Sequence, residues 1–231
     1  MPFDGMNSNQ GVSCVPLVGT PEDLPPECNG TWNMNGKFRP EKMAPFVPTA
    51  NQTADITHDI FVFGFQELGE AFKTVSRSAF YGGMEENLEK KSNAPREWID
   101  MDRYILQCIG CDECMFHKIA SIGLGGMYLI VCVKADLVKY ISNVKTHVVA
   151  TGFGQFLGNK GACLISMDIG KTSCLFVNCH LPAHQEFAHE RTEAFTRILK
   201  TSAEKFSQDP EGPTHTLFDK VFFFGDLNYR L

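Results

Sequence analysis

Four apolar runs of the sequence end in polar side chains, at positions where buried strands would reach the edge of a sheet. The six residues are Asn33, Glu67, Asn178, His180, Asp226 and Asn228. The last four form two pairs spaced two residues apart, and alternation along a strand places both members of such a pair on one face. Carboxylate, amide and imidazole groups are therefore expected together at the mouth of a sheet.

These residue types suit the metal-assisted attack of water on a phosphate ester. Hydrolysis of phosphate esters has one of the highest uncatalysed barriers known, so a catalyst must activate water and neutralise developing charge together. A hard divalent ion such as Mg²⁺ takes oxygen ligands, and Glu67 and Asn33 are the candidates. Asp226 and Asn228 could orient the attacking water, and His180 could donate to a phosphate oxygen.

Two cations lie close to these motifs in the sequence. Lys160 belongs to the tight turn Gly158-Asn159-Lys160-Gly161, where backbone N–H groups can approach an anion, and Arg230 follows the last pair. Each residue taken singly also has an ordinary interpretation, because a glutamate after a strand is usually a solvated edge and a GNKG segment usually a simple turn. Their joint occurrence at strand ends favours a phosphate-directed site.

The composition limits the class of protein. A chain of 231 residues with 43% hydrophobic and 21% charged residues is typical of a soluble globular protein. A net charge of −6 without a basic run argues against a nucleic-acid partner. No apolar stretch has the length of a membrane span, and residues 1–10 do not resemble a signal peptide. Nine cysteines, an odd number, predict reduced thiols and a cytoplasmic location.

Hydrophobic periodicity predicts a strand-rich α+β or α/β sandwich. Residues 1–28, rich in Gly, Pro, Asn and Ser, are predicted to be a flexible leader. The predicted strands cover residues 31–33, 59–67, 104–108, 127–134, 146–151, 161–168, 173–180 and the run before Asp226. One helix is predicted around Trp98 after an N-cap at Asn93, and an amphipathic helix over residues 185–206.

Five segments resemble, in order and spacing, the inositol polyphosphate 5-phosphatase family. They are TWNMNG at 31–36, FGFQEL at 63–68, GNKGA at 158–162, NCHLPAH at 178–184 and GDLNYR at 225–230. The resemblance implies a deoxyribonuclease I-like fold, in which helices flank two packed β-sheets. It also implies Mg²⁺-dependent removal of the 5-phosphate from phosphoinositides such as phosphatidylinositol 4,5-bisphosphate, or from soluble inositol polyphosphates. Residues 29–231 would then form the N-terminal two-thirds of such a catalytic domain.

The resemblance also implies roles for individual residues. Glu67 resembles the family's metal-ligating glutamate, with Asn33 beside it. Asp226 matches the residue that positions or deprotonates the water, assisted by Asn228.

On the substrate side, Asn178 and His180 match the family's pair that contacts the scissile phosphate. The residues implied to bind the rest of the substrate are Lys160, Asn159, His184 and Arg230.

The sequence departs from the family after GDLNYR. The resemblance implies about a hundred further residues, as in a domain of usual size. They would include a W-x-D-R-I/V-L segment near the 4-phosphate and an S-D-H-x-P segment whose Asp and His complete the site, and neither is present. Loss of one positioned acid or base typically lowers a rate ~10²–10⁴-fold, and missing strands expose a sheet edge. We therefore expect a truncated chain that is inactive alone.

Three alternatives stay open from the sequence. Cys108, Cys111, Cys114 and His117 recur every three residues and could bind zinc, although zinc ligands usually come in two separated pairs and a loop between strands is the alternative. The apolar loop residues 153, 156 and 157 could contact a membrane near a lipid substrate or pack within the loop. The chain could also be a non-catalytic inositol-phosphate-binding scaffold, or another enzyme of the fold such as an apurinic endonuclease or a sphingomyelinase.

Overall fold

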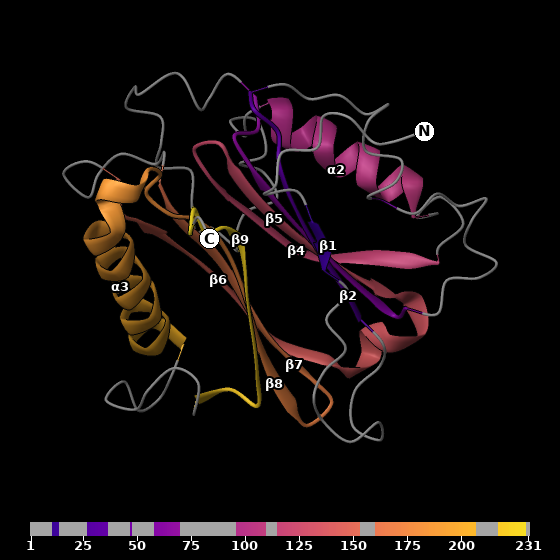
Figure 1. The fold of residues 1–231 in the computed structure, drawn as a ribbon. Helices are drawn as coiled ribbons and strands as arrows, with labels where there is room; N and C mark the ends of the chain where they lie inside the picture. Colours follow the sequence, from indigo (N-terminus) through magenta and orange to yellow (C-terminus); the bar gives the residue numbers. More distant parts are fainter. Residues whose placement is uncertain are drawn as a thin grey trace.

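The computed structural model describes residues 11–13, 27–36, 47, 58–69, 96–109, 115–152, 160–206 and 217–229 of the chain. Two β-sheets stack face to face, and a helix covers the outer face of each sheet (Figure 1). This four-layer arrangement of helix, sheet, sheet and helix confirms the predicted α+β sandwich.

The first sheet has the strand order β1-β2-β3-β5-β4. Its strands are β1 (Gly11–Ser13), β2 (Glu27–Asn33), β3 (Ile60–Gln66), β4 (Phe116–Leu124) and β5 (Met127–Lys134). β2 and β3 run parallel, with Asn33 opposite Gln66, whereas the other neighbours are antiparallel. The segments that follow β2 and β3 therefore leave the sheet side by side.

The second sheet has the strand order β6-β7-β8-β9. Its strands are β6 (Ile141–Ala150), β7 (Gly161–Ile169), β8 (Thr172–His180) and β9 (Lys220–Asp226). β8 and β9 form the parallel pair of this sheet, with His180 opposite Asp226, and the hairpin between β7 and β8 turns at Gly170. Each sheet thus contains one parallel pair that ends in polar residues.

β3 is buried on both faces, which explains its continuous apolar run. Phe61, Phe63 and Phe65 face the helix layer, whereas Ile60 and Val62 face the second sheet. Successive side chains of β3 therefore pack alternately into two separate hydrophobic cores.

The helices α2 (Arg96–Cys108) and α3 (Ala188–Phe206) each bury one stripe of side chains at helical spacing. Short 3₁₀ helices, η5 (Ala135–Tyr140) and η7 (Gln185–Phe187), connect β5 to β6 and lead into α3. Among the described residues, no helix has the length and apolar character needed to span a membrane.

Three elements differ from the expectations drawn from the sequence. Residues 104–108 form the last turns of α2 and not a strand, because Trp98, Met101 and Ile105 are buried at helical spacing over the sheet. β4 was not predicted, because an exposed residue, His117, and a buried glycine, Gly123, interrupt the apolar pattern. The segment predicted to be a leader contains β1 and the first residues of β2. β1 was not recognised in the sequence because a three-residue strand is too short to show alternation of apolar and polar residues. The N-cap at Asn93 lies outside the described residues.

Gly123 on β4 leaves the space that Trp98 of α2 occupies. A β-carbon at Gly123 would lie 2.4 Å from the Trp98 ring, which also stacks on Tyr128 with ring centroids 5.7 Å apart. We expect Gly123→Ala to lower the free energy of unfolding by about 1–3 kcal/mol, because the rigid ring can yield only if α2 shifts. Urea unfolding measures this effect. In a Trp98→Leu background the same substitution should have much less effect, and an unchanged effect would contradict the explanation.

Candidate active site

Both parallel strand pairs end at the same corner of the sandwich. Asn33, the last residue of β2, donates from Nδ2 to Glu67 Oε1 at 3.2 Å and to Asp226 Oδ2 at 3.0 Å. Asn33 Oδ1 in turn accepts from the backbone N–H of Asn35 at 3.0 Å. Because carboxylates only accept, this orientation of the amide satisfies all three groups. One side chain from the first sheet thus holds a carboxylate from each sheet.

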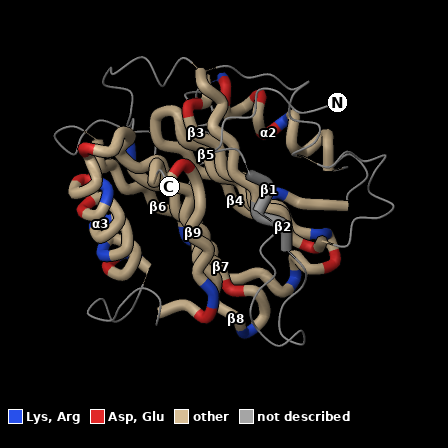
Figure 2. Tube along the Cα trace, viewed as in Figure 1, with Lys and Arg blue, Asp and Glu red and all other residues tan. Residues whose placement is uncertain are grey.

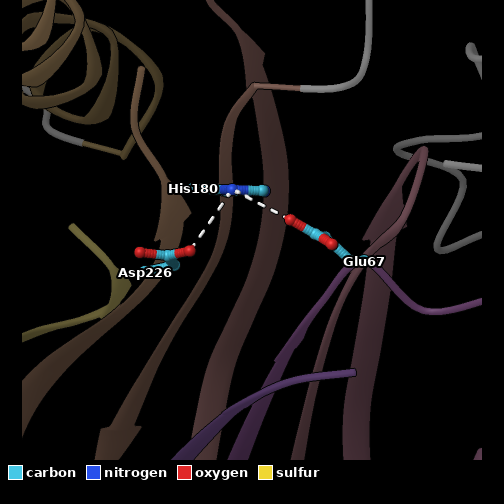
Figure 3. A group of neighbouring side chains, drawn as sticks. All are labelled: Glu67, His180 and Asp226. Carbon is cyan, nitrogen blue, oxygen red and sulfur yellow. Dashed lines mark ion pairs between the residues drawn. The ribbon is translucent and has the colours of Figure 1, made fainter. Parts of the chain in front are cut away.

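His180 points between the two carboxylates (Figure 3). Its Nε2 lies 3.8 Å from Glu67 Oε1 and 3.5 Å from Asp226 Oδ2, and one ligand atom from each of these residues falls within a 4.8 Å cluster. Burial, and then the positive charge of Lys160, lowers the pKa of His180 to about 3. The imidazole is therefore uncharged at neutral pH and does not form an ion pair with either carboxylate.

Lys160 supplies the positive charge of the cluster. Its Nζ lies 2.5 Å from His180 Nε2, so the neutral ring accepts a hydrogen bond from the ammonium group. Burial lowers the pKa of Lys160, although Asp226 and Glu67 act in the opposite direction. Lys160, rather than His180 Nε2, therefore presents protons toward the centre of the site.

Asp226 is fixed by the turn that follows β9. The backbone N–H of Asn228 donates to Asp226 Oδ1 at 3.2 Å, and Asn228 Nδ2 donates to the carbonyl of Leu181 at 2.9 Å. The N–H of Leu181 donates to the carbonyl of Asp226 at 3.0 Å. Asn228 consequently connects the ends of β8 and β9 and orients the Asp226 carboxylate.

Asn178 lies deeper in the sandwich than was predicted. It is fully buried, and its Nδ2 donates to the carbonyls of Phe65 at 3.1 Å and Tyr128 at 3.0 Å. Its Oδ1 accepts from Gln66 Nε2 at 2.6 Å. The structure does not support a contact between Asn178 and the scissile phosphate, because the side-chain amide is hydrogen-bonded between the two sheets.

Unusual backbone conformations concentrate at this corner. Five described residues other than glycine have positive φ, and four of them, Asn35, Glu67, His184 and Asn228, directly follow β2, β3, β8 or β9 or lie within four residues of their ends. Such conformations typically cost about 1–3 kcal/mol and persist where the surroundings enforce them, often at functional sites.

The sequence of the chain matches a known family. Residues 30–231 match the family described as Endonuclease/Exonuclease/phosphatase family 2. The chain belongs to this family. Among solved structures of similar fold is the inositol polyphosphate 5-phosphatase domain of SPsynaptojanin, in complex with inositol (1,4)-bisphosphate and calcium ion. It has a TM-score of 0.60 and 27% sequence identity, over 88% of this chain and 52% of that chain. The sandwich is therefore the deoxyribonuclease I-like fold.

Curated relatives within the family are 5-phosphatases. Phosphatidylinositol 3,4,5-trisphosphate 5-phosphatase 2A of Danio rerio is 32% identical over 209 residues, which cover 87% of this chain and 14% of the relative. Type II inositol 1,4,5-trisphosphate 5-phosphatase of Mus musculus is 31% identical over 205 residues, which cover 87% of this chain and 18% of the relative. The chain thus spans less than a fifth of these relatives and about half of the synaptojanin structure.

For this member of the family, most of the predicted site residues that the structure describes lie together. The group comprises Asn33, Glu67, Lys160, His180, Asp226 and Asn228. His184 is exposed, on the segment after β8, and its ring lies 6.3 Å from that of Phe187. Asn159 and Arg230 lie outside the described residues, as do Cys111, Cys114 and the loop residues 153–157.

Sequence reasoning missed two residues that shape the site. Gln66 bonds both Asn178 and Thr31 of β2. A β-carbon at Gly64 would lie 2.6 Å from the Asn178 side chain and from the Phe224 ring, so glycine leaves the space for the buried amide. The signal was available, because a glycine and a glutamine interrupt the apolar run of β3 two residues apart.

Two of the residues at the site carry oxygen atoms suited to a hard divalent cation. Glu67 and Asp226 present carboxylate oxygens to one small volume, and such oxygens are the preferred ligands of Mg²⁺ and Ca²⁺. Asn33, predicted as a ligand, instead presents its NH₂ group to this volume, while its oxygen faces Asn35. Asn33 therefore positions the two carboxylates in this structure.

Proposed function

We propose that this chain forms the site of a Mg²⁺-dependent phosphatase that removes the 5-phosphate of phosphoinositides or soluble inositol polyphosphates. The observation that carries the proposal is the bridge from Asn33 to Glu67 and Asp226, which brings a carboxylate from each sheet beside the Lys160–His180 pair. The 5-phosphatases among its relatives support the substrate class.

Glu67 would hold the Mg²⁺ ion, in a volume that the Asp226 carboxylate also faces. Bound there, the ion would supply Lewis-acid polarisation of the phosphate and a water molecule of lowered pKa. The two carboxylates outnumber the single ammonium group of Lys160, so the cluster retains negative charge for a divalent cation.

The chain's own residues contribute binding, orientation and proton handling. Lys160 donates to a phosphate oxygen and offsets the charge that develops there. His180, uncharged, accepts from Lys160 and so orients the ammonium group. Asp226 accepts the proton of the attacking water, and Asn228 keeps that carboxylate in place. Asn178 and Gln66 position the strand ends without contacting substrate.

The proposal extends to partners and location. The substrate is an inositol phosphate headgroup, in a lipid such as phosphatidylinositol 4,5-bisphosphate or free in solution, and contact with the cytosolic face of a membrane follows for the lipid. The described cysteines 108, 132, 163, 174 and 179 are free thiols, which supports a cytoplasmic location. Acidic and basic residues are mixed along α3 (Figure 2), and the proposed partners do not include nucleic acid.

Phosphate release and ligand binding test the proposal separately. The 231-residue chain is incubated with inositol 1,4,5-trisphosphate, or with vesicles that contain phosphatidylinositol 4,5-bisphosphate, in Mg²⁺ or in EDTA. Because Glu67, Lys160 and Asp226 lie together in this chain, we expect release of the 5-phosphate that requires Mg²⁺, and not the inactivity expected from the sequence. Mg²⁺-dependent binding without release in this chain would favour the non-catalytic alternative. The absence of both binding and release would refute the proposed function.

Lys160→Met is expected to lower kcat about 10²–10³-fold, because a donor aimed at developing charge is lost while the length of the side chain is kept. Steady-state kinetics with Mg²⁺ measures the effect. Lys171→Met is the matched control, because Lys171 is exposed in the hairpin at the opposite end of β7. Equal effects of the two substitutions would contradict the role of Lys160.

A further inference from the structure

Arg191 on α3 is a buried cation at a position where the helix pattern calls for an apolar residue. Its side chain is 5% exposed, and it shares the buried stripe of α3 with Ala194 and Ile198. Arginine is rarely this buried unless a carboxylate pairs with it. No ion pair joins Arg191 to an acidic residue in the described part of the chain. Its burial therefore needs another explanation.

The hydrogen bonds of Arg191 go to the segment after His180. Its Nη1 donates to the carbonyls of Pro182 at 3.0 Å and His184 at 2.5 Å. His184 has a φ of 71°, a strained conformation for a residue with a β-carbon. Arg191 thus holds a segment that would otherwise relax, two to four residues beyond the imidazole of the site.

The same guanidinium group contacts the segment after Asp226. Its central carbon lies 5.4 Å from the centroid of the Tyr229 ring, a cation–π contact. Tyr229 directly follows Asn228, whose side chain already bonds to the carbonyl of Leu181. Two side chains therefore connect the segments that follow β8 and β9. Asn228 connects them next to the strand ends, and Arg191 connects them further along.

We propose that Arg191 is a positioning residue that clamps residues 181–184 against residues 226–229 and so maintains the spacing of His180 and Asp226. One nitrogen of the guanidinium group donates to both carbonyls while the planar group lies over the Tyr229 ring, and an apolar residue could make neither contact. This geometry explains why an arginine occupies an apolar stripe. The inference rests on the proposed function only for its effect on turnover.

Hydrogen–deuterium exchange tests the clamp without reference to activity. In Arg191→Met, we expect the amides of residue 181, residues 183–187 and residues 227–229 to exchange about tenfold faster or more, because the hydrogen bonds that hold the first segment are lost. The amides of β5 and β7 should keep their wild-type rates. Lys200→Met, an exposed substitution further along α3, is the matched control and should change neither segment.

Turnover separates positioning from a purely structural role. We expect Arg191→Met to lower kcat about tenfold or more with a smaller change in KM, and Arg191→Lys, which keeps the charge, to recover part of the loss. If Arg191→Met does not fold, Tyr229→Leu removes the ring contact alone and should raise exchange in residues 181–184. Wild-type exchange in both segments of the folded variants would overturn the clamp. Failure of the wild-type chain to hydrolyse substrate would refute only the proposed function.

Discussion

Asp226→Ala is expected to lower kcat/KM for Mg²⁺-dependent phosphate release by about 10²–10⁴-fold. The substitution removes the proposed proton acceptor and one of the two carboxylates that face the cation site. Steady-state kinetics gives the loss of activity, and titration calorimetry with Mg²⁺ should show weaker metal binding. The far-UV circular dichroism spectrum should stay that of the wild type, because Asp226 lies at the end of β9.

Asp226→Asn should be almost as damaging, although it keeps the shape of the side chain. In one orientation its NH₂ group would face the NH₂ group of Asn33, and in the other it would face the backbone N–H of Asn228. Asp219→Ala is the control, since Asp219 bonds Ser173 at the opposite, exposed end of β9. If Asp226→Asn retains near-wild-type turnover, Asp226 is not the proton acceptor.

Asn178→Ala is expected to lower the free energy of unfolding by about 3–5 kcal/mol. The substitution removes the side chain that bonds the buried carbonyls of Phe65 and Tyr128 and the amide of Gln66, and the loss of a hydrogen-bond partner in the interior costs about 1–3 kcal/mol per group. Chemical denaturation measures the change.

Cys174→Ala is the control for Asn178→Ala. Cys174 is buried on the same strand and the same face of β8 as Asn178. The loss of its sulfur should lower the free energy of unfolding by only about 1 kcal/mol. Wild-type stability combined with lost phosphate binding in Asn178→Ala would show that Asn178 contacts substrate, and would contradict its placement between the sheets.

Much of the fold was predictable because its buried strands carry long apolar runs. β3, β5, β7 and β8 have cores on both faces, so their sequences are almost continuously apolar. The pattern was not sufficient for residues 104–108, where a short apolar stretch fits either a strand or the last turns of a helix. Only the burial of Met101 and Trp98 over the sheet identifies α2.

The site was predictable as a group of residues but not in its depth or its contacts. Spacing places Asn178 and His180 on one face of β8, yet each residue of a strand advances the chain by about 3.3 Å, so Asn178 lies roughly 7 Å deeper. The sequence also could not reveal that Asn33 turns its NH₂ group inward, because that orientation depends on two carboxylates contributed by other strands. Arg191 carried no recognisable signal, since its acceptors are backbone carbonyls.

The bond between Asn33 and Asp226 joins residues that are 193 positions apart in the chain. Closing so long a loop is entropically unfavourable, so this corner is expected to assemble late in folding, after the local hairpins. A ligand that binds only the assembled corner stabilises the whole sandwich in proportion to the logarithm of its concentration. The midpoint of thermal unfolding would then rise with Mg²⁺ and inositol phosphate, and binding at one corner would report on the integrity of both sheets.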